Sequence, residues 1–262
     1  MKRHLPNALT CLNLLCGCLA LTCILGSGTR LKYLELGAYL VAVAAVADFF
    51  DGFVARALRV SSPIGKDLDS LADMVSFGVV PGAMVFALLI SSSTHYAFGA
   101  EWFSSFPFPD EVKMLVPFAG FGITIFSALR LAKFNNDTRQ TNSFIGLPTP
   151  ACTLVVASLP VILAHDDFKL GSIILNPWVL LGLTVLLSGL LVAELPLFAL
   201  KFKNLQWRGN RRRFIFVALA LGLVGWLHAA GVPLAVLLYV LLSVPGRVRS
   251  REALEPAANA PQ

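Results

Sequence analysis

The sequence predicts an all-α fold: a polytopic membrane helix bundle of about eight transmembrane helices, with both termini in the cytoplasm. The 262 residues are 56% hydrophobic and only 14% charged, whereas a soluble domain carries about 25% charged residues. Apolar runs of about 20 residues, the length that crosses a bilayer, recur along the whole chain. Lysine and arginine gather in alternate loops, which sets the expected orientation.

Eight apolar runs define the expected spans. They lie near residues 8–26, 36–58, 70–92, 113–134, 149–164, 176–200, 212–229 and 232–245. Residues 1–200 are expected to form a six-helix core, residues 201–249 to add two C-terminal helices, and residues 250–262 to be a disordered tail.

The basic residues orient these spans. With the N-terminus in the cytoplasm, the outer segments hold only Arg30, Lys32, Lys113 and Lys169, and all other lysines and arginines fall on the inner side. An excess of Lys and Arg marks the cytoplasmic side of a membrane protein. The even number of spans then returns the C-terminus to the cytoplasm.

Cysteines and loops add less specific signals. The five cysteines (Cys11, Cys16, Cys18, Cys23 and Cys152) match no zinc spacing, so we interpret them as small apolar core residues. The first run lacks an A-x-A-like site and is expected to be a span rather than a cleaved leader. The aromatic outer segment 94–111 fits an interfacial belt better than a lid. The basic run 208–213 is either a topology signal or a site for anionic lipid headgroups.

Four aspartates lie in phase near the inner ends of the second and third spans. Asp48 and Asp51 are three residues apart, and Asp69 and Asp73 are four apart, so each pair shares one helix face. Two antiparallel neighbouring helices can therefore point all four carboxylates into one cleft. Polar residues at helix ends, paired with nearby cations, would explain any one of them but not four in phase.

Clustered carboxylates repel one another, and they tolerate this when they bind cations. Oxygen-only ligands suit Mg²⁺, Mn²⁺ or Ca²⁺, and paired metals are typical of displacement at phosphorus. Small Gly52 and Ala55 would let a bulky group approach the second span, and Gly65 would serve the turn before the third. Arg56 has a fork suited to phosphate oxygens. Asp67 is out of phase and is expected to be a solvated charge.

This pattern resembles the signature of the CDP-alcohol phosphotransferase family, D-x2-D-G-x2-A-R-x8-G-x3-D-x3-D. Every gap matches at Asp48, Asp51, Gly52, Ala55, Arg56, Gly65, Asp69 and Asp73. The flanks 5–20, 69–82 and 128–151 resemble those of the membrane-integral phosphatidylserine synthases, with 193–201 weaker but compatible. The resemblance spans residues 5–200 and would make them the catalytic membrane domain.

The resemblance implies an enzyme that transfers the phosphatidyl group from CDP-diacylglycerol to L-serine and releases CMP. It implies that the four aspartates hold two divalent cations, Mg²⁺ or Mn²⁺, and that Asp73 is the general base. Gly52, Ala55, Arg56 and Gly65 would belong to the nucleotide and phosphate site. A homodimer in a bacterial inner membrane, surrounded by lipids, with its active site facing the cytoplasm, is expected. No nucleic-acid partner is expected.

The remaining site residues are less determined. Asn7 and Thr10 would either contact the nucleotide or cap the first helix. Arg130 would bind the serine carboxylate or extend towards the membrane surface. Ser76 and Thr149 would line the acceptor pocket or only pack. Glu194, expected in the inner third of the sixth span, would pair with a cation or hold the serine ammonium.

Two other functions remain open. A sister enzyme would use glycerol 3-phosphate, inositol phosphate or choline as the acceptor, and the signature alone does not exclude it. A cation transporter would use the aspartates as an ion site. However, transporter sites usually lie near the bilayer midplane within repeats, whereas these acids lie at the helix ends and no repeat is visible.

Overall fold

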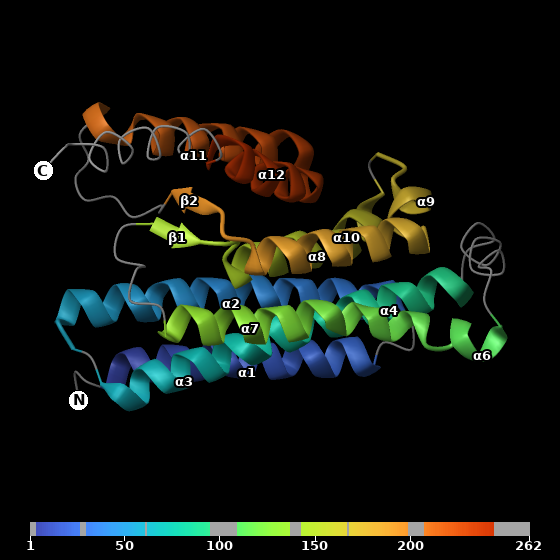
Figure 1. The fold of residues 1–262 in the computed structure, drawn as a ribbon, viewed down its shortest axis with the longest axis horizontal. Coiled ribbons are helices and arrows are strands. Elements are labelled where there is room, and N and C mark those ends of the chain that lie inside the picture. Colours follow the sequence, from blue (N-terminus) through green and yellow to red (C-terminus); the bar gives the residue numbers. More distant parts are fainter. Residues whose placement is uncertain are drawn as a thin grey trace, which may run out of the picture.

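The computed structural model describes residues 4–26, 30–60, 62–94, 109–136, 143–166, 168–198 and 207–243. Figure 1 shows these residues as a helical bundle with one short strand pair. The elements are α1 (His4–Gly26), α2 (Leu31–Leu58), α3 (Pro63–Met74), a π-helical turn (Val75–Val79), α4 (Val80–Thr94), α6 (Asp110–Lys113), a 3-10 helix (Val116–Phe121), α7 (Gly122–Asn136), β1 (Ser143–Ile145), α8 (Thr149–His165), α9 (Gly171–Ile174), α10 (Pro177–Val192), β2 (Pro196–Phe198), α11 (Trp207–Leu227), a 3-10 turn (His228–Ala230) and α12 (Gly231–Ser243).

The predicted all-α membrane bundle is confirmed. Five helical stretches are long and apolar enough to cross a membrane: His4–Gly26, Leu31–Leu58, Pro63–Ser92, Val116–Asn136 and Arg213–Ser243. The last stretch folds back on itself as the α11–α12 hairpin, and α8 and α10 are shorter apolar helices. Together these segments correspond to the eight predicted spans.

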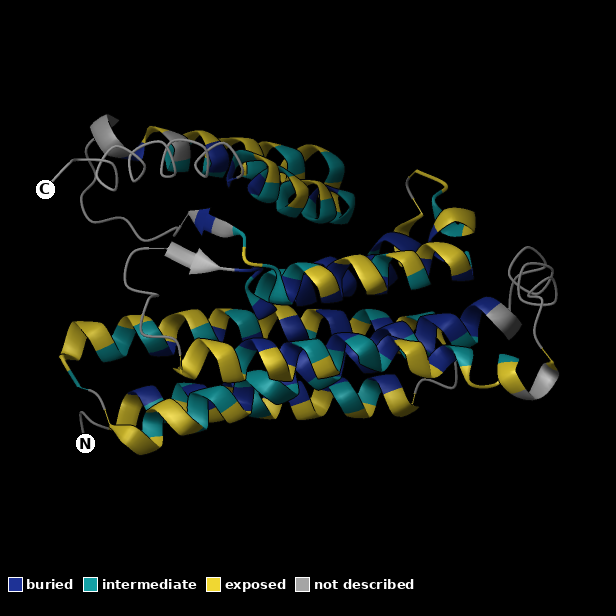
Figure 2. Ribbon diagram, viewed as in Figure 1, coloured by how far each residue is buried: buried dark blue, intermediate teal, exposed yellow. Residues whose placement is uncertain are grey.

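The helices form layers around a central α4 (Figure 1). α1, α2, α3, α4 and α7 run along the long axis in Figure 1, α8 and α10 pack on them, and the α11–α12 hairpin lies outermost. In the stretch Pro63–Ser92, 72% of the apolar 18-residue segment is buried inside the protein. In Arg213–Ser243 the corresponding share is only 11%. Figure 2 shows the same contrast between α4 and the hairpin.

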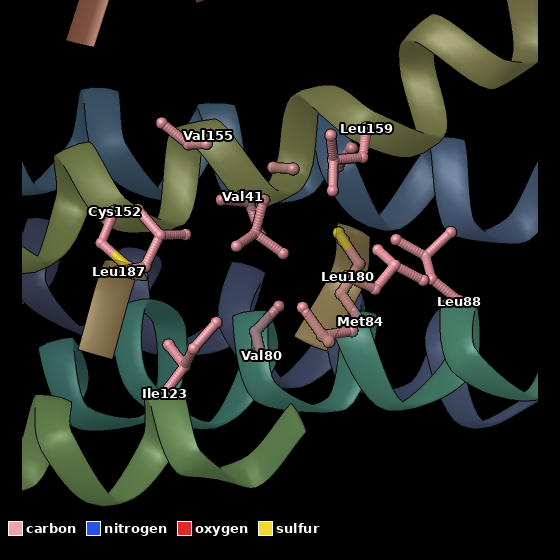
Figure 3. Packing of buried hydrophobic residues seen from close by; sticks show 14 of the residues in the cluster. Val41, Val80, Met84, Leu88, Ile123, Cys152, Val155, Leu159, Leu180 and Leu187 are labelled. Atoms are coloured by element: carbon pink, nitrogen blue, oxygen red, sulfur yellow. The ribbon is translucent and has the colours of Figure 1, made fainter. Parts of the chain in front are cut away.

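The core joins α2, α4, α7, α8 and α10. Val41, Met84, Ile123, Cys152 and Leu180 interlock in Figure 3, and all are buried. By contrast, α2 exposes large apolar side chains, as expected where a helix meets lipid rather than water. These exposed side chains include Val43, Val46, Phe49, Phe50 and Phe53.

The cysteine prediction holds only in part. Cys16 and Cys152 are buried, Cys23 is intermediate, and Cys11 and Cys18 are exposed on α1. All five are free thiols. The two exposed thiols follow from the helical period, which turns their positions away from α2 and α3.

The third span begins earlier than predicted, at Pro63 instead of residue 70. The hydroxyl of Ser62 accepts a hydrogen bond from the Gly65 backbone N–H at 3.0 Å, and Pro63 occupies the first helical turn. Both features favour helix initiation. The polar first turns at Pro63 and the apolar span therefore form one continuous helical segment.

The sixth span ends earlier than predicted, at Val192 instead of residue 200. The chain then forms β2, which pairs antiparallel with β1 in the register Ser143–Phe198, Phe144–Leu197 and Ile145–Pro196. Gly146, with φ of 82°, follows β1, and a Cβ there would lie 2.6 Å from the Leu191 carbonyl oxygen. A side chain would therefore block this close approach between the two connections.

Several sequence predictions fall outside the described residues. These are most of the aromatic segment 94–111, namely 95–108, and the tail 250–262. Within the basic run 208–213, Arg213 donates to Asn210 Oδ1 at 2.7 Å near the start of α11. Lipid binding by this run stays a prediction.

Candidate active site

The connection between α2 and α3 brings the aspartates together. α2 ends at Leu58, and Arg59 adopts a left-handed conformation with φ of 52°. The Val60 backbone N–H donates to the Ala55 carbonyl at 3.0 Å, which satisfies an orphan carbonyl of the last turn. Because the Ser62 cap starts α3 soon afterwards, only a short connection separates the two helices, and α1 packs against both of them.

Three carboxylates from α2 and α3 converge near this connection. One oxygen from each of Asp48, Asp51 and Asp69 lies within 4.8 Å of the others. Asp51 is buried, whereas Asp48 and Asp69 are half-buried. Asp73 lies close enough to interact electrostatically with all three. In the described part of the chain, no other group of three or more acidic, His or Cys side chains comes this close.

α1 contributes two hydrogen-bond donors to these carboxylates. Thr10 Oγ1 donates to Asp51 Oδ2 at 2.7 Å, and Asn13 Nδ2 donates to Asp73 Oδ1 at 3.2 Å. Thr10 and Asn13 are three residues apart and so share a helix face. Asn13 was missed in the sequence, although its phase with Thr10 in an apolar run was a usable signal.

A pocket of about 240 Å³ opens beside the carboxylates, between α1, α2 and α3. Predicted site residues line much of it, and Pro6, Val60, Ser62 and Lys66 were not predicted. The predicted lining residues are Asn7, Thr10, Asp51, Gly52, Ala55, Gly65 and Asp69. The sequence pattern therefore located the pocket, while its outer wall comes from the α2–α3 connection.

Glycine keeps one wall of the pocket thin. A Cβ at Gly65 would lie 2.9 Å from Ser62 Oγ and 3.1 Å from Asn7 Oδ1. A Cβ at Gly52 would lie 3.4 Å from an Arg56 guanidinium nitrogen. Arg56 itself is exposed and is not among the described lining residues, so its guanidinium lies beside the pocket rather than in its wall.

The acceptor candidates lie elsewhere. None of Ser76, Arg130, Thr149 and Glu194 is among the described residues that line the pocket. Ser76 is buried and donates to the Asn13 backbone carbonyl at 3.0 Å. Thr149 is buried at the start of α8.

Arg130 and Glu194 differ from expectation in opposite ways. Arg130 is only 5% exposed, its Nε donates to the Leu147 carbonyl at 3.4 Å, and its guanidinium lies 5.4 Å from the Phe134 ring centroid. It is thus held inside the bundle. The placement of Glu194 within the sixth span was wrong, because α10 ends at Val192 and Glu194 is exposed beyond it. Its charge therefore needs no buried partner.

A π-helical turn, Val75–Val79, begins two residues after Asp73, where α3 ends, and was not predicted. Hydroxyl groups from neighbouring helices donate hydrogen bonds to two backbone carbonyls of this turn. Thr153 donates to Phe77 O at 3.0 Å, and Thr124 donates to Gly78 O at 2.9 Å. Inside a membrane such backbone groups need protein partners, and π-turns often accompany functional sites. The turn links the Asp73 helix to α7 and α8.

The donor set fits a divalent cation. Asp69 Oδ1 is buried and has no hydrogen-bond partner among the described residues. A buried carboxylate oxygen without a partner costs free energy, as does its proximity to the other carboxylates. A hard cation bound by these oxygens would relieve both costs. The residues that would hold it are Asp48, Asp51, Asp69 and Asp73.

Known proteins resemble this chain over the same region. A family model described as CDP-alcohol phosphatidyltransferase matches residues 3–192. Three relatives carry the name CDP-diacylglycerol–serine O-phosphatidyltransferase. The Helicobacter pylori protein is 32% identical over 191 residues, which cover 72% of this chain and 70% of that protein. The Bacillus subtilis protein is 30% identical over 184 residues, which cover 66% and 87%. The Saccharomyces cerevisiae protein is 32% identical over 136 residues, which cover 48% and 42%.

Proposed function

This chain belongs to the CDP-alcohol phosphatidyltransferase family, and from that premise we propose that it transfers the phosphatidyl group of CDP-diacylglycerol to L-serine. The observation that carries the proposal is the convergence of Asp48, Asp51 and Asp69 beside one pocket, with Asp73 next to them. The names of the relatives support CDP-diacylglycerol and serine as the substrates.

The reaction is a displacement at phosphorus. The serine hydroxyl oxygen attacks the phosphorus that carries the diacylglycerol, and a new P–O bond forms. The bond from that phosphorus to the oxygen bridging to CMP breaks, so CMP leaves with that oxygen. The hydroxyl proton passes to the Asp73 carboxylate, since an alcohol is a weak nucleophile until a base within reach accepts its proton.

Two divalent cations, Mg²⁺ or Mn²⁺, would neutralise charge on the diphosphate and on the departing CMP when bound. Asp48, Asp51, Asp69 and Asp73 are the residues proposed to hold them. Thr10 keeps the Asp51 carboxylate oriented through its 2.7 Å hydrogen bond. These carboxylates thus serve to orient the diphosphate at the reacting phosphorus.

The cytidine end of the donor occupies the pocket between α1, α2 and α3. Gly52 and Gly65 leave room for the nucleotide, and Lys66 supplies a cation in the lining for phosphate oxygens. Arg56 lies beside Gly52 and completes the phosphate side. The acyl chains remain in lipid, next to the exposed apolar face of α2.

The site faces the cytoplasm of a bacterial inner membrane in this proposal. Lysine and arginine concentrate on the side that holds the aspartates, and CMP and serine are water-soluble. Homodimer formation, suggested by the family resemblance, is part of the same proposal.

Acceptor choice tests the proposed function. Purified enzyme with CDP-diacylglycerol and Mg²⁺ is expected to incorporate labelled serine into lipid and to release one CMP for each phosphatidylserine formed. Labelled glycerol 3-phosphate, inositol phosphate and choline, supplied separately, should give no labelled lipid. Incorporation of one of these instead of serine would identify a sister enzyme. Absence of CMP release with every alcohol would contradict the transferase proposal itself.

Arg130 is buried, and its planar guanidinium fork matches the geometry of a carboxylate, so it is proposed to bind the carboxylate of serine. Replacing Arg130 with alanine should raise the KM for serine by roughly 10- to 100-fold, as expected for loss of a charge-assisted hydrogen bond. The KM for CDP-diacylglycerol should change less than about threefold. Steady-state kinetics of both substrates measure the difference.

Lys133 gives a matched control for this substitution, because it lies on the same helix but is exposed. Lys133→Ala should leave both KM values near those of the parent enzyme. If Arg130→Ala raises both KM values equally, Arg130 supports the fold or binds phosphate instead of serine.

A further inference from the structure

The contact between Asn13 and Asp73 carries an inference that rests on the proposed function of Asp73 as the base. Asn13 is fully buried in α1, and its Nδ2 lies 3.2 Å from Asp73 Oδ1. The amide nitrogen can only donate, and an ionised carboxylate can only accept. The hydrogen bond therefore fixes which Asp73 oxygen faces α1.

The position of Asn13 along the bundle is itself fixed. The Ser76 hydroxyl donates to the Asn13 backbone carbonyl at 3.0 Å, across the contact between α1 and the π-helical turn. Gly17, one turn further along α1, lies against Ser76, and a Cβ there would collide with the Ser76 side chain. The close approach of the two helices thus sets the height of the Asn13 amide relative to Asp73.

Stability alone does not explain an asparagine at this position. Asn13 Oδ1 is buried and has no hydrogen-bond partner among the described residues. An unpaired buried amide oxygen destabilises the folded chain. An apolar residue of similar volume would avoid that cost, and polar side chains within membrane helices commonly serve function.

We propose that Asn13 is a positioning residue: its amide holds one oxygen of Asp73 so that the other meets the hydroxyl of the acceptor alcohol. Asn13 does not itself exchange a proton, and no bond to it forms or breaks. Its effect is on the orientation of the base, so its loss should lower kcat rather than weaken substrate binding.

Two nearly isosteric variants test the proposal. Asn13→Leu removes the donor without adding charge, and Asn13→Asp keeps the shape but cannot donate while ionised. Each should lower kcat by roughly 10- to 100-fold, with KM values for both substrates within about threefold of the parent. The melting temperature of Asn13→Leu should stay close to that of the parent enzyme, whereas the added carboxylate of Asn13→Asp should lower it by repelling Asp73. A matched control is Thr184→Val, which removes a buried hydroxyl that donates at 2.8 Å to Leu180 O in its own helix and should leave kcat near that of the parent enzyme.

A double-mutant cycle with Asp73→Asn distinguishes positioning from a general effect on structure. If Asn13 acts through Asp73, then Asn13→Leu should have little further effect on the residual kcat of Asp73→Asn. An equal fold-loss in both backgrounds, unchanged kcat in the folded single variants, or unfolding of both Asn13 variants would overturn the proposal. The cycle is run with whichever alcohol the parent enzyme accepts, so a wrong assignment of serine would be recognised separately.

Discussion

Replacing Asp73 with asparagine should lower kcat by about 10²–10⁴-fold, the usual contribution of a positioned general base. The amide has nearly the same shape but cannot accept the hydroxyl proton. Its neighbours Asp48, Asp51 and Asp69 remain in place, and Asn13 still faces it from α1. The variant should therefore fold and bind CDP-diacylglycerol, which equilibrium binding and turnover assays on the same preparation would measure.

Asp67 provides the control for this substitution. It lies on the same helix but is exposed and does not belong to the carboxylate cluster. Asp67→Asn should retain turnover within about twofold of the parent. If Asp73→Asn also turned over at nearly the parental rate, Asp73 would not be the base and the proton would have to leave by another route.

Removal of divalent cations should lower activity by an amount comparable to that of the Asp73→Asn substitution. Chelation is expected to lower activity by at least about 100-fold, because cation stabilisation of phosphoryl transfer amounts to several kcal/mol. Added Mg²⁺ or Mn²⁺ should restore it. The same cations should also raise the melting temperature, because binding to the folded state alone stabilises it by about 2.7 kcal/mol at 100 times Kd.

The thermal shift gives a readout that does not depend on turnover. Asp69→Asn should lose most of the cation-induced shift, since Asp69 Oδ1 is a buried carboxylate oxygen that has no hydrogen-bond partner in the described part of the chain. Asp67→Asn should keep the full shift. A shift that is equal in both variants would place the cation outside the carboxylate cluster, and absence of any shift in the parent would contradict cation binding there.

The sequence was sufficient to predict the bundle because a bilayer demands long apolar helices. The runs that became α1, α2 and α8 agree with the predicted spans to within a few residues. The aspartates were predictable as a cluster because helical periodicity places Asp48 with Asp51 and Asp69 with Asp73. Cation binding by the aspartates and phosphate binding by Arg56 followed from side-chain chemistry, the role of Asp73 as base came from the family resemblance, and all of these stay predictions.

Other features depend on contacts between distant segments. The π-helical turn Val75–Val79 exists together with the hydroxyls of Thr124 and Thr153, which lie on other helices. The three-residue strands β1 and β2 are too short to give an alternating pattern. Asn13 could be assigned to Asp73 only after α1 and α3 were seen together.

The end of α10 shows the same limit. Composition extended the sixth span to residue 200, because the segment after Val192 remains mostly apolar. In the structure that segment turns to pair with β1, which places Glu194 on the surface. The sequence therefore predicted a buried charge at Glu194, but the helix ends at Val192, before the chain reaches that residue.

A structure determined with Mn²⁺ and a CDP-containing ligand would test the central claim most directly. The account predicts anomalous density within about 2.5 Å of carboxylate oxygens contributed by α2 and α3, with the ligand's phosphates on the same ions. Asp48, Asp51, Asp69 and Asp73 should all point towards that density. Nucleotide bound in the pocket with no ion density, and with the four side chains turned away from one another, would contradict it.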